Sequence, residues 1–207
     1  MDLMKKKILF DQCKVLYHED FTREILAKDF DIRGGEWYVQ DGYLIGQNKG
    51  NDAGMVISKA SYTGNVLLDF KASTILPSTH DISVMWNGAW DYEKNTRSAG
   101  YIAGIQGWWQ GKAGFEKAPD HALCAATGLF PFEPGREYHF QIGSIDGHMF
   151  IYADGQLLFE LMDPAPIDNT LYGKIGFEAY CSHIRFRVFY VKQAVYAPLA
   201  ETYEPEF

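Results

Sequence analysis

Four polar side chains near the C-terminal end of the sequence are of types that could act together on a substrate. They lie in residues 173–193, GKIGFEAYCSHIRFRVFYVKQ, where two alternating runs meet at Cys181-Ser182. If this pair forms a hairpin turn, one face of the hairpin carries Glu178, His183, Arg185 and Arg187. A carboxyl beside cationic groups can transfer a proton or accept hydrogen bonds from hydroxyls. Glu178 is therefore a candidate catalytic residue and the other three are candidate substrate-binding residues. The alternative is a solvated cross-strand salt bridge, which contributes about 0.2–1 kcal/mol.

A second candidate group lies in residues 98–117, SAGYIAGIQGWWQGKAGFEK. Alternation along a strand would place Gly104, Gln106 and Trp108 on the same side. Glycine leaves room, an amide can bond paired hydroxyls, and an indole ring can stack on a sugar, so this side suits a saccharide. We expect Gln106 and Trp108 to bind substrate, followed by a loop in which Glu116 could border the groove. The alternative is a bend in which Trp108 packs over the glycines.

The stretch HDISVMWNGAW, residues 80–90, supplies two further candidates. Alternation predicts an apolar face that includes Trp86 and a more polar face made of Asp81, Ser83, Met85 and Asn87. We expect Asn87 to contact ligand from the polar face. Trp90 follows Gly88 in an expected loop, where an exposed ring would suit stacking on a sugar.

Short aromatic and β-branched runs bounded by turn signals predict the elements that position these residues. Asp-Gly pairs at 41–42, 146–147 and 154–155 separate alternating runs, which is a strong hairpin signal. Only Phe21–Phe30 has a helical pattern, with Thr22 as an N-cap. We therefore predict an all-β fold, a two-sheet antiparallel sandwich of the jelly-roll type. Residues 1–207 would form one domain, with a short lead at 1–12 and a tail at 194–207.

Composition and charge limit the classes of partner that the protein could bind. The chain has 207 residues, 19 Lys and Arg against 27 Asp and Glu, and a formal net charge of -8. Such an acidic chain has no general attraction for nucleic acid or anionic membranes, so we expect neither as a partner. The apolar run at Ile8–Phe10 is shorter than the roughly 7–15 residues of a signal peptide, which favours a cytoplasmic protein. The aromatic fraction of 15% leaves oligomerisation possible.

Several blocks of the sequence resemble the concanavalin A-like lectin/glucanase superfamily. They include DFDIRGGEWYVQDGYLIGQ, GMVISKASYTGNVLLDFKAS and PGREYHFQIGSIDGHMFIYADGQLLFEL, as well as the closing stretch quoted above. Within the superfamily, the sequence is most similar to the bacterial 3-keto-disaccharide hydrolase domain and related uncharacterised polysaccharide-utilisation proteins. The resemblance covers roughly Val15 to Gln193. It implies a jelly roll in which a concave sheet binds saccharide along a groove.

The resemblance does not extend to a known catalytic pattern. Retaining glucanases of this superfamily use E-x-D-x-E, because alternate residues share a face and their carboxyls lie about 5–5.5 Å apart. That pattern is absent, and the similarly spaced Asp29 and Asp31 lie in a turn-like stretch. The six histidines and three cysteines show no metal-ligand spacing. We expect no cofactor and assign no metal ligands, although the resemblance makes a structural calcium ion possible.

Three functions are compatible with this sequence. The first is hydrolysis of a glycoside or keto-sugar, with the oligosaccharide bound on the concave sheet. The second is carbohydrate binding without catalysis. The third is a structural or oligomerising sandwich without a ligand. Carboxyls from different strands that converge in the groove would favour hydrolysis, whereas amides and rings alone would favour binding.

Overall fold

The computed structural model describes residues 1–21, 26–50, 52, 54–107, 111–128 and 130–199. In chain order the elements are β1 (Asp2–Leu3), β2 (Lys6–Ile8), η1 (Phe10–Gln12), β3 (Lys14–Glu19), α1 (Leu26–Asp29), β4 (Phe30–Ile32), β5 (Glu36–Gln40), β6 (Tyr43–Asn48), β7 (Gly54–Ser58), β8 (Val66–Thr74), β9 (Ile82–Asp91), β10 (Thr96–Gly107), β11 (Lys112–Ala118), β12 (Leu123–Thr127), β13 (Tyr138–Ile145), β14 (His148–Ala153), β15 (Gln156–Met162), β16 (Lys174–Ala179), β17 (Ser182–Gln193) and β18 (Tyr196–Pro198). The helical pattern at 21–30 gives the single turn α1, while Thr22 lies outside the described residues.

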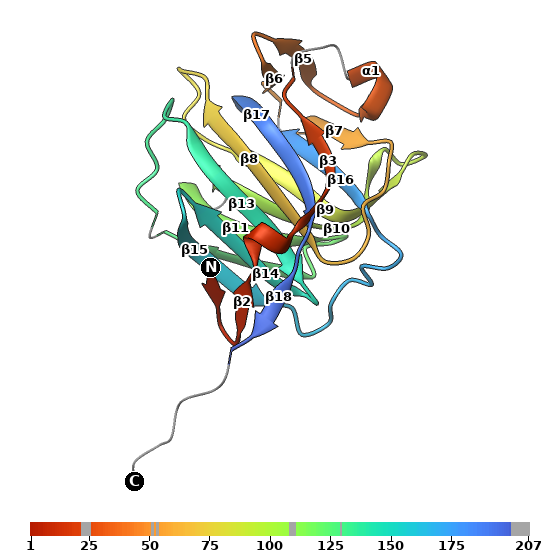
Figure 1. Ribbon diagram of the computed structural model, residues 1–207. Coiled ribbons are helices and arrows are strands. Elements are labelled where there is room, and N and C mark those ends of the chain that lie inside the picture. The colour runs from red at the N-terminus through yellow and green to blue at the C-terminus, as the bar shows by residue number, and fades with distance from the viewer. Residues whose placement is uncertain (22–25, 51, 53, 108–110, 129, 200–207) are drawn as a thin grey trace.

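Two antiparallel sheets stack into a sandwich, which confirms the predicted fold (Figure 1). The seven-stranded sheet has the order β12-β11-β10-β9-β16-β7-β4. The eight-stranded sheet has the order β15-β14-β13-β8-β17-β6-β5, and β3 pairs with β17. Strands that are consecutive in the chain often lie in different layers, as expected for a jelly roll.

The three Asp-Gly pairs form the predicted hairpins between β5 and β6, β13 and β14, and β14 and β15. In each pair both residues have a positive φ, for example 51° at Asp41 and 78° at Gly42. This conformation fits the twist of the flanking strands.

Aromatic side chains fill the space between the two sheets. Phe177 of β16 and Phe186 of β17 are fully buried, and their ring centroids lie 4.6 Å apart. Trp86 of β9 packs on Tyr101 of β10 at 5.7 Å and donates a hydrogen bond to Ser144 Oγ. These contacts fix β9, β10, β16 and β17 on the side that faces the core.

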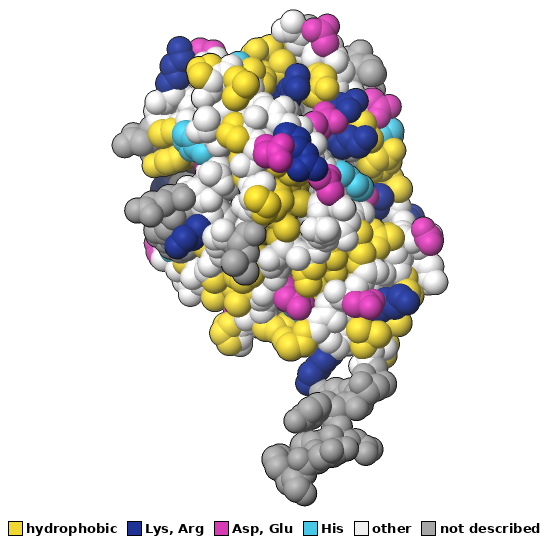
Figure 2. Space-filling view, turned by 90° about the vertical axis from the view of Figure 1, so that its left-hand side faces the viewer, with side chains coloured by type: hydrophobic (Ala, Val, Ile, Leu, Met, Phe, Trp, Pro, Cys, Tyr) yellow, Lys and Arg dark blue, Asp and Glu magenta, His cyan; other side chains and the backbone are white. Residues whose placement is uncertain are grey.

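The segments at the two ends of the chain form a third, small sheet with the order β1-β2-β18. It covers an apolar cluster that includes Leu3, Ile8 and Phe150. In the part of the chain that the structure describes, no helix is both long and apolar enough to cross a membrane. Figure 2 shows charged side chains of both signs together in the upper part of one side of the molecule. That face has no broad area of a single sign.

The predicted hairpin between Glu178 and Arg185 is wrong. β16 pairs with β7 and β9, whereas β17 pairs with β3, β6 and β8 in the other sheet. Cys181, with a φ of 49°, lies where the chain passes from one layer to the other. The pattern of alternating residues is the same for a hairpin and for such a crossover, so the sequence did not separate the two.

Candidate functional site

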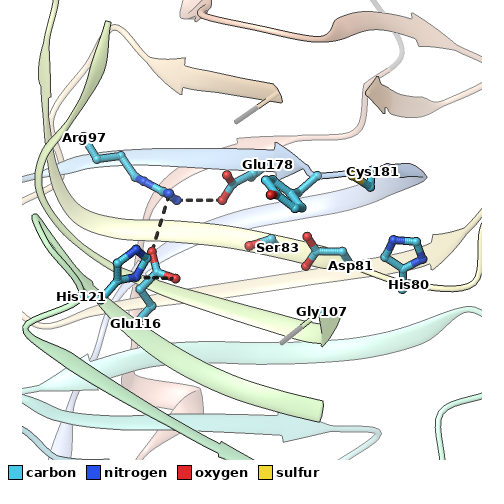
Figure 3. Close-up of a pocket in the computed structure, with 10 residues that line it drawn as sticks. His80, Asp81, Ser83, Arg97, Gly107, Glu116, His121, Glu178 and Cys181 are labelled. Atoms are coloured by element: carbon cyan, nitrogen blue, oxygen red, sulfur yellow. Dashed lines mark hydrogen bonds and ion pairs between the residues drawn. The ribbon is translucent and has the colours of Figure 1, made fainter. Parts of the chain in front are cut away.

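A cavity of about 620 Å³ opens on the outer face of the seven-stranded sheet. Figure 3 shows its polar side chains converging from several strands and loops. The lining residues are His80, Asp81, Ser83, Arg97, Gly107, Glu116, His121, Glu178, Tyr180 and Cys181. The volume is within the range of about 300–1,000 Å³ typical of sites for small ligands.

Strand alternation places the acidic side chains in this cavity. Phe115 and Phe177 belong to the core between the sheets, so their neighbours Glu116 and Glu178 point outward. Glu178 lies opposite Ser83 in the pairing of β16 with β9. Glu116 comes from β11, on the other side of β10. Two carboxyls from different strands are thus brought to one cavity.

Arg97 holds these two glutamates together. Its Nη1 donates to Glu178 Oε2 at 2.8 Å, and its Nη2 lies 3.6 Å from Glu116 Oε1. His121 Nδ1 approaches Glu116 Oε2 at 3.3 Å. Burial raises the pKa of Glu178, the guanidinium of Arg97 opposes this rise, and the charge of Glu116 adds to it. The ion pair therefore favours the charged form of Glu178 in a site where solvation is poor.

Asp81 is the third carboxyl of the cavity and has a different environment. Its exposed fraction is 8%, and its side chain accepts no hydrogen bond from the residues that the structure describes. Burial, followed by the charges of Glu178 and Glu116, raises the pKa of Asp81 well above its ordinary value, and Arg97 offsets this only in part. The cavity thus contains one carboxyl that favours its protonated form next to one that is ion-paired.

Asp81 is fitted closely into this position. Its backbone has a φ of 65°, an uncommon value for a residue with a side chain. A Cβ atom at Gly107 would lie only 2.4 Å from Asp81 Oδ1. The absence of a side chain at Gly107 therefore makes room for the carboxyl.

We expect Gly107→Ala to displace the Asp81 carboxyl and to weaken any ligand binding in the cavity. The added methyl group overpacks the site, which typically costs about 1–3 kcal/mol of stability. Thermal unfolding and ligand titration would measure the two effects. Gly128→Ala is a suitable control, because the atoms nearest to a Cβ added at Gly128 lie 3.8 Å away. Gly155→Ala would not be equivalent, because the φ of Gly155 is 81° and an alanine there would be strained. Unchanged binding in Gly107→Ala would show that the position of Asp81 is unimportant.

An apolar cluster lies beside the cavity, on the same outer face of the seven-stranded sheet. It consists of Met55, Ile57, Met85, Trp90, Ile102 and Ala118. Trp90 was expected to be exposed for sugar stacking, but its exposed fraction is 8% and it packs into this cluster. The connection after Trp90 is held down where Arg33 donates to Asn95 Oδ1 at 2.7 Å and Asn95 donates back to Arg33 O at 3.0 Å. The predicted exposure of Trp90 is wrong because Trp90 belongs to β9 rather than to a loop, and its ring packs into this cluster.

Two other predicted binding residues that the structure describes, Asn87 and Gln106, do not line the cavity. Asn87 is completely buried and donates to Gly64 O and Tyr172 O, so its predicted contact with ligand is wrong. A positive φ of 44° at Asn87, where the pairing of β9 with β10 is irregular, breaks the alternation used in the prediction. Gln106 is half-buried, and its amide lies near Gly111. Trp108 is outside the described residues.

The candidates on β17 lie in the other sheet. Arg185 donates to Ser73 Oγ and stacks on Tyr43, while Arg187 forms an ion pair with Glu137. His183 borders a smaller hollow next to the cavity. Among the predicted catalytic and substrate-binding residues that the structure describes, only Glu178 lines the cavity itself, and it does so with partners other than those expected.

Sequence reasoning did not select Asp81, Arg97 or His121. Alternation in residues 80–90 did indicate that Asp81 and Ser83 share a polar face, which was the available signal. Glu116 was expected only to border a groove. Within the described ranges, no group of three or more His, Cys, Asp or Glu side chains is placed to hold a metal ion. No ligand set for the calcium ion implied by the resemblance can therefore be assigned.

A comparison with protein-family models and with curated proteins found no match. Solved structures with a similar fold include a protein of unknown function with a galectin-like fold from Bacillus subtilis, at 18% identity and a TM-score of 0.67 over 88% of this chain and 97% of that chain. The carbohydrate-binding module CBM66 from Bacillus subtilis is similar at 14% identity and a TM-score of 0.61, over 79% of this chain and 95% of that chain. The β-glucanase from Bacillus licheniformis is similar at 11% identity and a TM-score of 0.60, over 85% and 96%.

At these identities the likeness concerns the fold. The chain has a jelly-roll fold like that of a carbohydrate-binding module and a β-glucanase, which is the fold that the resemblance in sequence implied. The finer similarity to the 3-keto-disaccharide hydrolase domain stays a prediction. A shared fold does not fix a function, which has to be argued from the cavity.

Proposed function

We propose that the protein binds a saccharide in the cavity of the seven-stranded sheet and hydrolyses a glycosidic bond there. The observation that carries this proposal is the pair formed by Asp81 and Glu178, two carboxyls of one cavity. Burial raises the pKa of both, but Glu178 has the ion pair with Arg97 that opposes this rise, whereas the pKa of Asp81 is raised well above its ordinary value. Two carboxyls whose environments give them different pKa values are the usual acid and base of glycoside hydrolysis. The fold shared with a β-glucanase and a carbohydrate-binding module supports the same class of ligand.

The roles of the two carboxyls follow from their surroundings. Protonated Asp81 donates its proton to the glycosidic oxygen as the bond from that oxygen to the anomeric carbon breaks. Ionised Glu178 stabilises the positive charge that develops at the anomeric carbon and takes a proton from the water that adds there. Arg97 keeps Glu178 ionised and in place, with Nη1 at 2.8 Å from its Oε2. The products are two sugars with free hydroxyl groups, and one water is consumed.

Binding without catalysis is the second candidate, and one specific observation favours it. Arg97 contacts both Glu178 and Glu116, so neither carboxylate is free of a counter-charge. A guanidinium group flanked by two carboxylates can bind neighbouring sugar hydroxyls without any reaction.

A thermal-shift screen followed by product analysis separates these functions. The screen contains neutral, acidic and 3-keto oligosaccharides, the last because of the resemblance in sequence. Binding raises the unfolding temperature, and hydrolysis in addition releases reducing ends. If no sugar shifts the unfolding temperature, hydrolysis and binding are both wrong.

We expect Glu178→Gln to lower the turnover of a confirmed substrate by about 10²-fold or more, since it removes the ionised partner of the acid. The amide retains the shape of the carboxyl and can still bind sugar hydroxyls, so the thermal shift should persist. Glu93→Gln, at an exposed position in the connection between β9 and β10, is the matched control and should behave like the wild type. Unchanged turnover in Glu178→Gln would remove its catalytic role and leave binding as the function.

A further inference from the structure

Two smaller hollows continue from the border of the cavity. The second hollow has a volume of about 400 Å³ and shares His80 and Cys181 with the cavity. The third hollow, of about 370 Å³, shares Gln47, Asn48 and Lys49 with the second. The shared walls join the three hollows into one path, which leaves the outer face of the seven-stranded sheet.

The wall between the cavity and the second hollow is held in place by hydrogen bonds between segments far apart in the sequence. Asn48 Nδ2 donates to Ala179 O at 3.2 Å, and Cys181 N donates to Gly50 O at 3.3 Å. On the other side, His183 N donates to Ser78 Oγ at 3.0 Å. Because these loops are tied to one another, the path exists before a ligand arrives, which lowers the entropic cost of binding.

The lining of the second hollow includes amides, hydroxyls, two histidines and Lys49, with no carboxylate among the described residues, and the third hollow adds the carboxyls of Glu36 and Asp52. The charged side chains along the path are therefore of both signs, which does not favour a ligand with a net charge. The amide of Asn48 is already used in the bonds that shape the wall. The amide of Gln47 and the hydroxyl of Thr79 form no side-chain hydrogen bond within the described part of the chain, so both are available to a ligand. Amides and hydroxyls match the alternating donors and acceptors of uncharged sugar rings.

We infer that the saccharide extends from the cavity over His80 and Cys181 into the second and third hollows. The ligand is then an uncharged oligosaccharide of more than one sugar unit, and Gln47 and Thr79 bind the units outside the cavity. This inference rests on the proposed function, because the cavity has to hold the first unit. It assigns binding to a surface that the proposed catalytic groups do not touch.

The test measures affinity against chain length by isothermal titration calorimetry. The probes are ladders of one to five units of β-1,4-gluco-, β-1,4-xylo-, β-1,4-manno- and β-2,1-fructo-oligosaccharides, titrated into Glu178→Gln so that hydrolysis does not shorten them. In the ladder that binds, we expect the affinity to rise about tenfold or more between one unit and three, a gain of about 1.4 kcal/mol. Gln47→Ala and Thr79→Ala, each added to Glu178→Gln, should reduce this gain to less than about half on the logarithmic scale. Gln40→Ala, at an exposed position in the hairpin of β5 and β6, is the matched control and should leave it intact.

Each outcome distinguishes the inference from the proposed function. A ladder that binds with equal affinity at every length overturns the inference and leaves the proposed function intact. A gain with length that both Gln47→Ala and Thr79→Ala preserve places the additional units elsewhere and also overturns it. If no ladder binds and the screen of acidic and keto-sugars is negative too, the proposed function fails and the inference fails with it. Thermal unfolding would detect a folding defect in either variant. If one variant is defective, the other still tests the inference.

Discussion

Asp81→Asn is expected to abolish most of the turnover while making the protein more stable. As the proton donor, Asp81 should contribute about 10²–10⁴-fold to the rate of hydrolysis. The same carboxyl is 8% exposed and lies near the charges of Glu178 and Glu116, so its ionisation opposes folding at neutral pH. An amide has nearly the same shape, carries no charge and tolerates the positive φ of this position. Residues that lower stability in this way are typical of functional sites.

The pH dependence gives an independent check on the role of Asp81. Its pKa in the folded state lies above the value in the unfolded chain, so the stability lost through its ionisation appears as the pH rises from the unfolded to the folded pKa. The turnover of the wild type should fall over the upper part of that range, as the acid loses its proton. In Asp81→Asn, the gain in stability over the wild type should be largest at high pH and should vanish in acid.

The measurements are thermal unfolding and initial rates between pH 4 and pH 9. A gain of about 1 kcal/mol would raise the unfolding temperature by about 2–4 °C for a chain of this size. Asp11→Asn, at an exposed position in η1, controls for the loss of a carboxylate elsewhere. If Asp81→Asn lowers the stability or keeps full turnover, the carboxyl is structural and another group supplies the proton.

The sequence predicted the fold well because the fold depends on local signals. Each Asp-Gly pair requires a positive φ at both positions, and this selects a tight hairpin with little influence from the rest of the chain. Alternation then correctly assigned Phe177, Phe186 and Trp86 to the core. These signals act over a few residues and do not depend on how the sheets are arranged.

The candidate site was harder to predict because it depends on irregular backbone and on which layer each strand joins. The shift in register between Arg97 and Ala99 changes which way β10 presents its side chains. Neither this shift nor the irregularity at Asn87 has a clear signature in the sequence. The crossover at Cys181 separates Glu178 from Arg185, and Glu178 finds Arg97 in its place. The alternative expectation for Glu178, a solvated salt bridge with an arginine of the same hairpin, holds only in that an arginine is its partner: the ion pair is with Arg97 and is buried.

Arg97→Ala should cause the largest loss of stability of any single substitution in the cavity. Arg97 is the described cation in contact with both Glu116 and Glu178, whose side chains are each 7% exposed. Removing one partner of a buried ion pair typically costs about 3–5 kcal/mol, because the remaining charge stays buried without compensation. At about 2–4 °C for each kcal/mol, the unfolding temperature should fall by roughly 6–20 °C.

A double-mutant cycle shows whether this loss comes from the charge or from packing of the arginine side chain. Arg97→Ala combined with Glu178→Gln removes both charges of the pair that lies 2.8 Å apart, so part of the lost stability should return. Arg97→Lys retains a charge but not the fork that reaches two glutamates, and it should therefore lose less than alanine does. The loss in Arg97→Ala should also diminish toward acid pH, because protonation neutralises the Glu178 carboxylate that has lost its ion pair. An additive cycle and a loss that does not vary with pH would mean that Arg97 acts through packing, and that Glu178 does not need it to remain ionised.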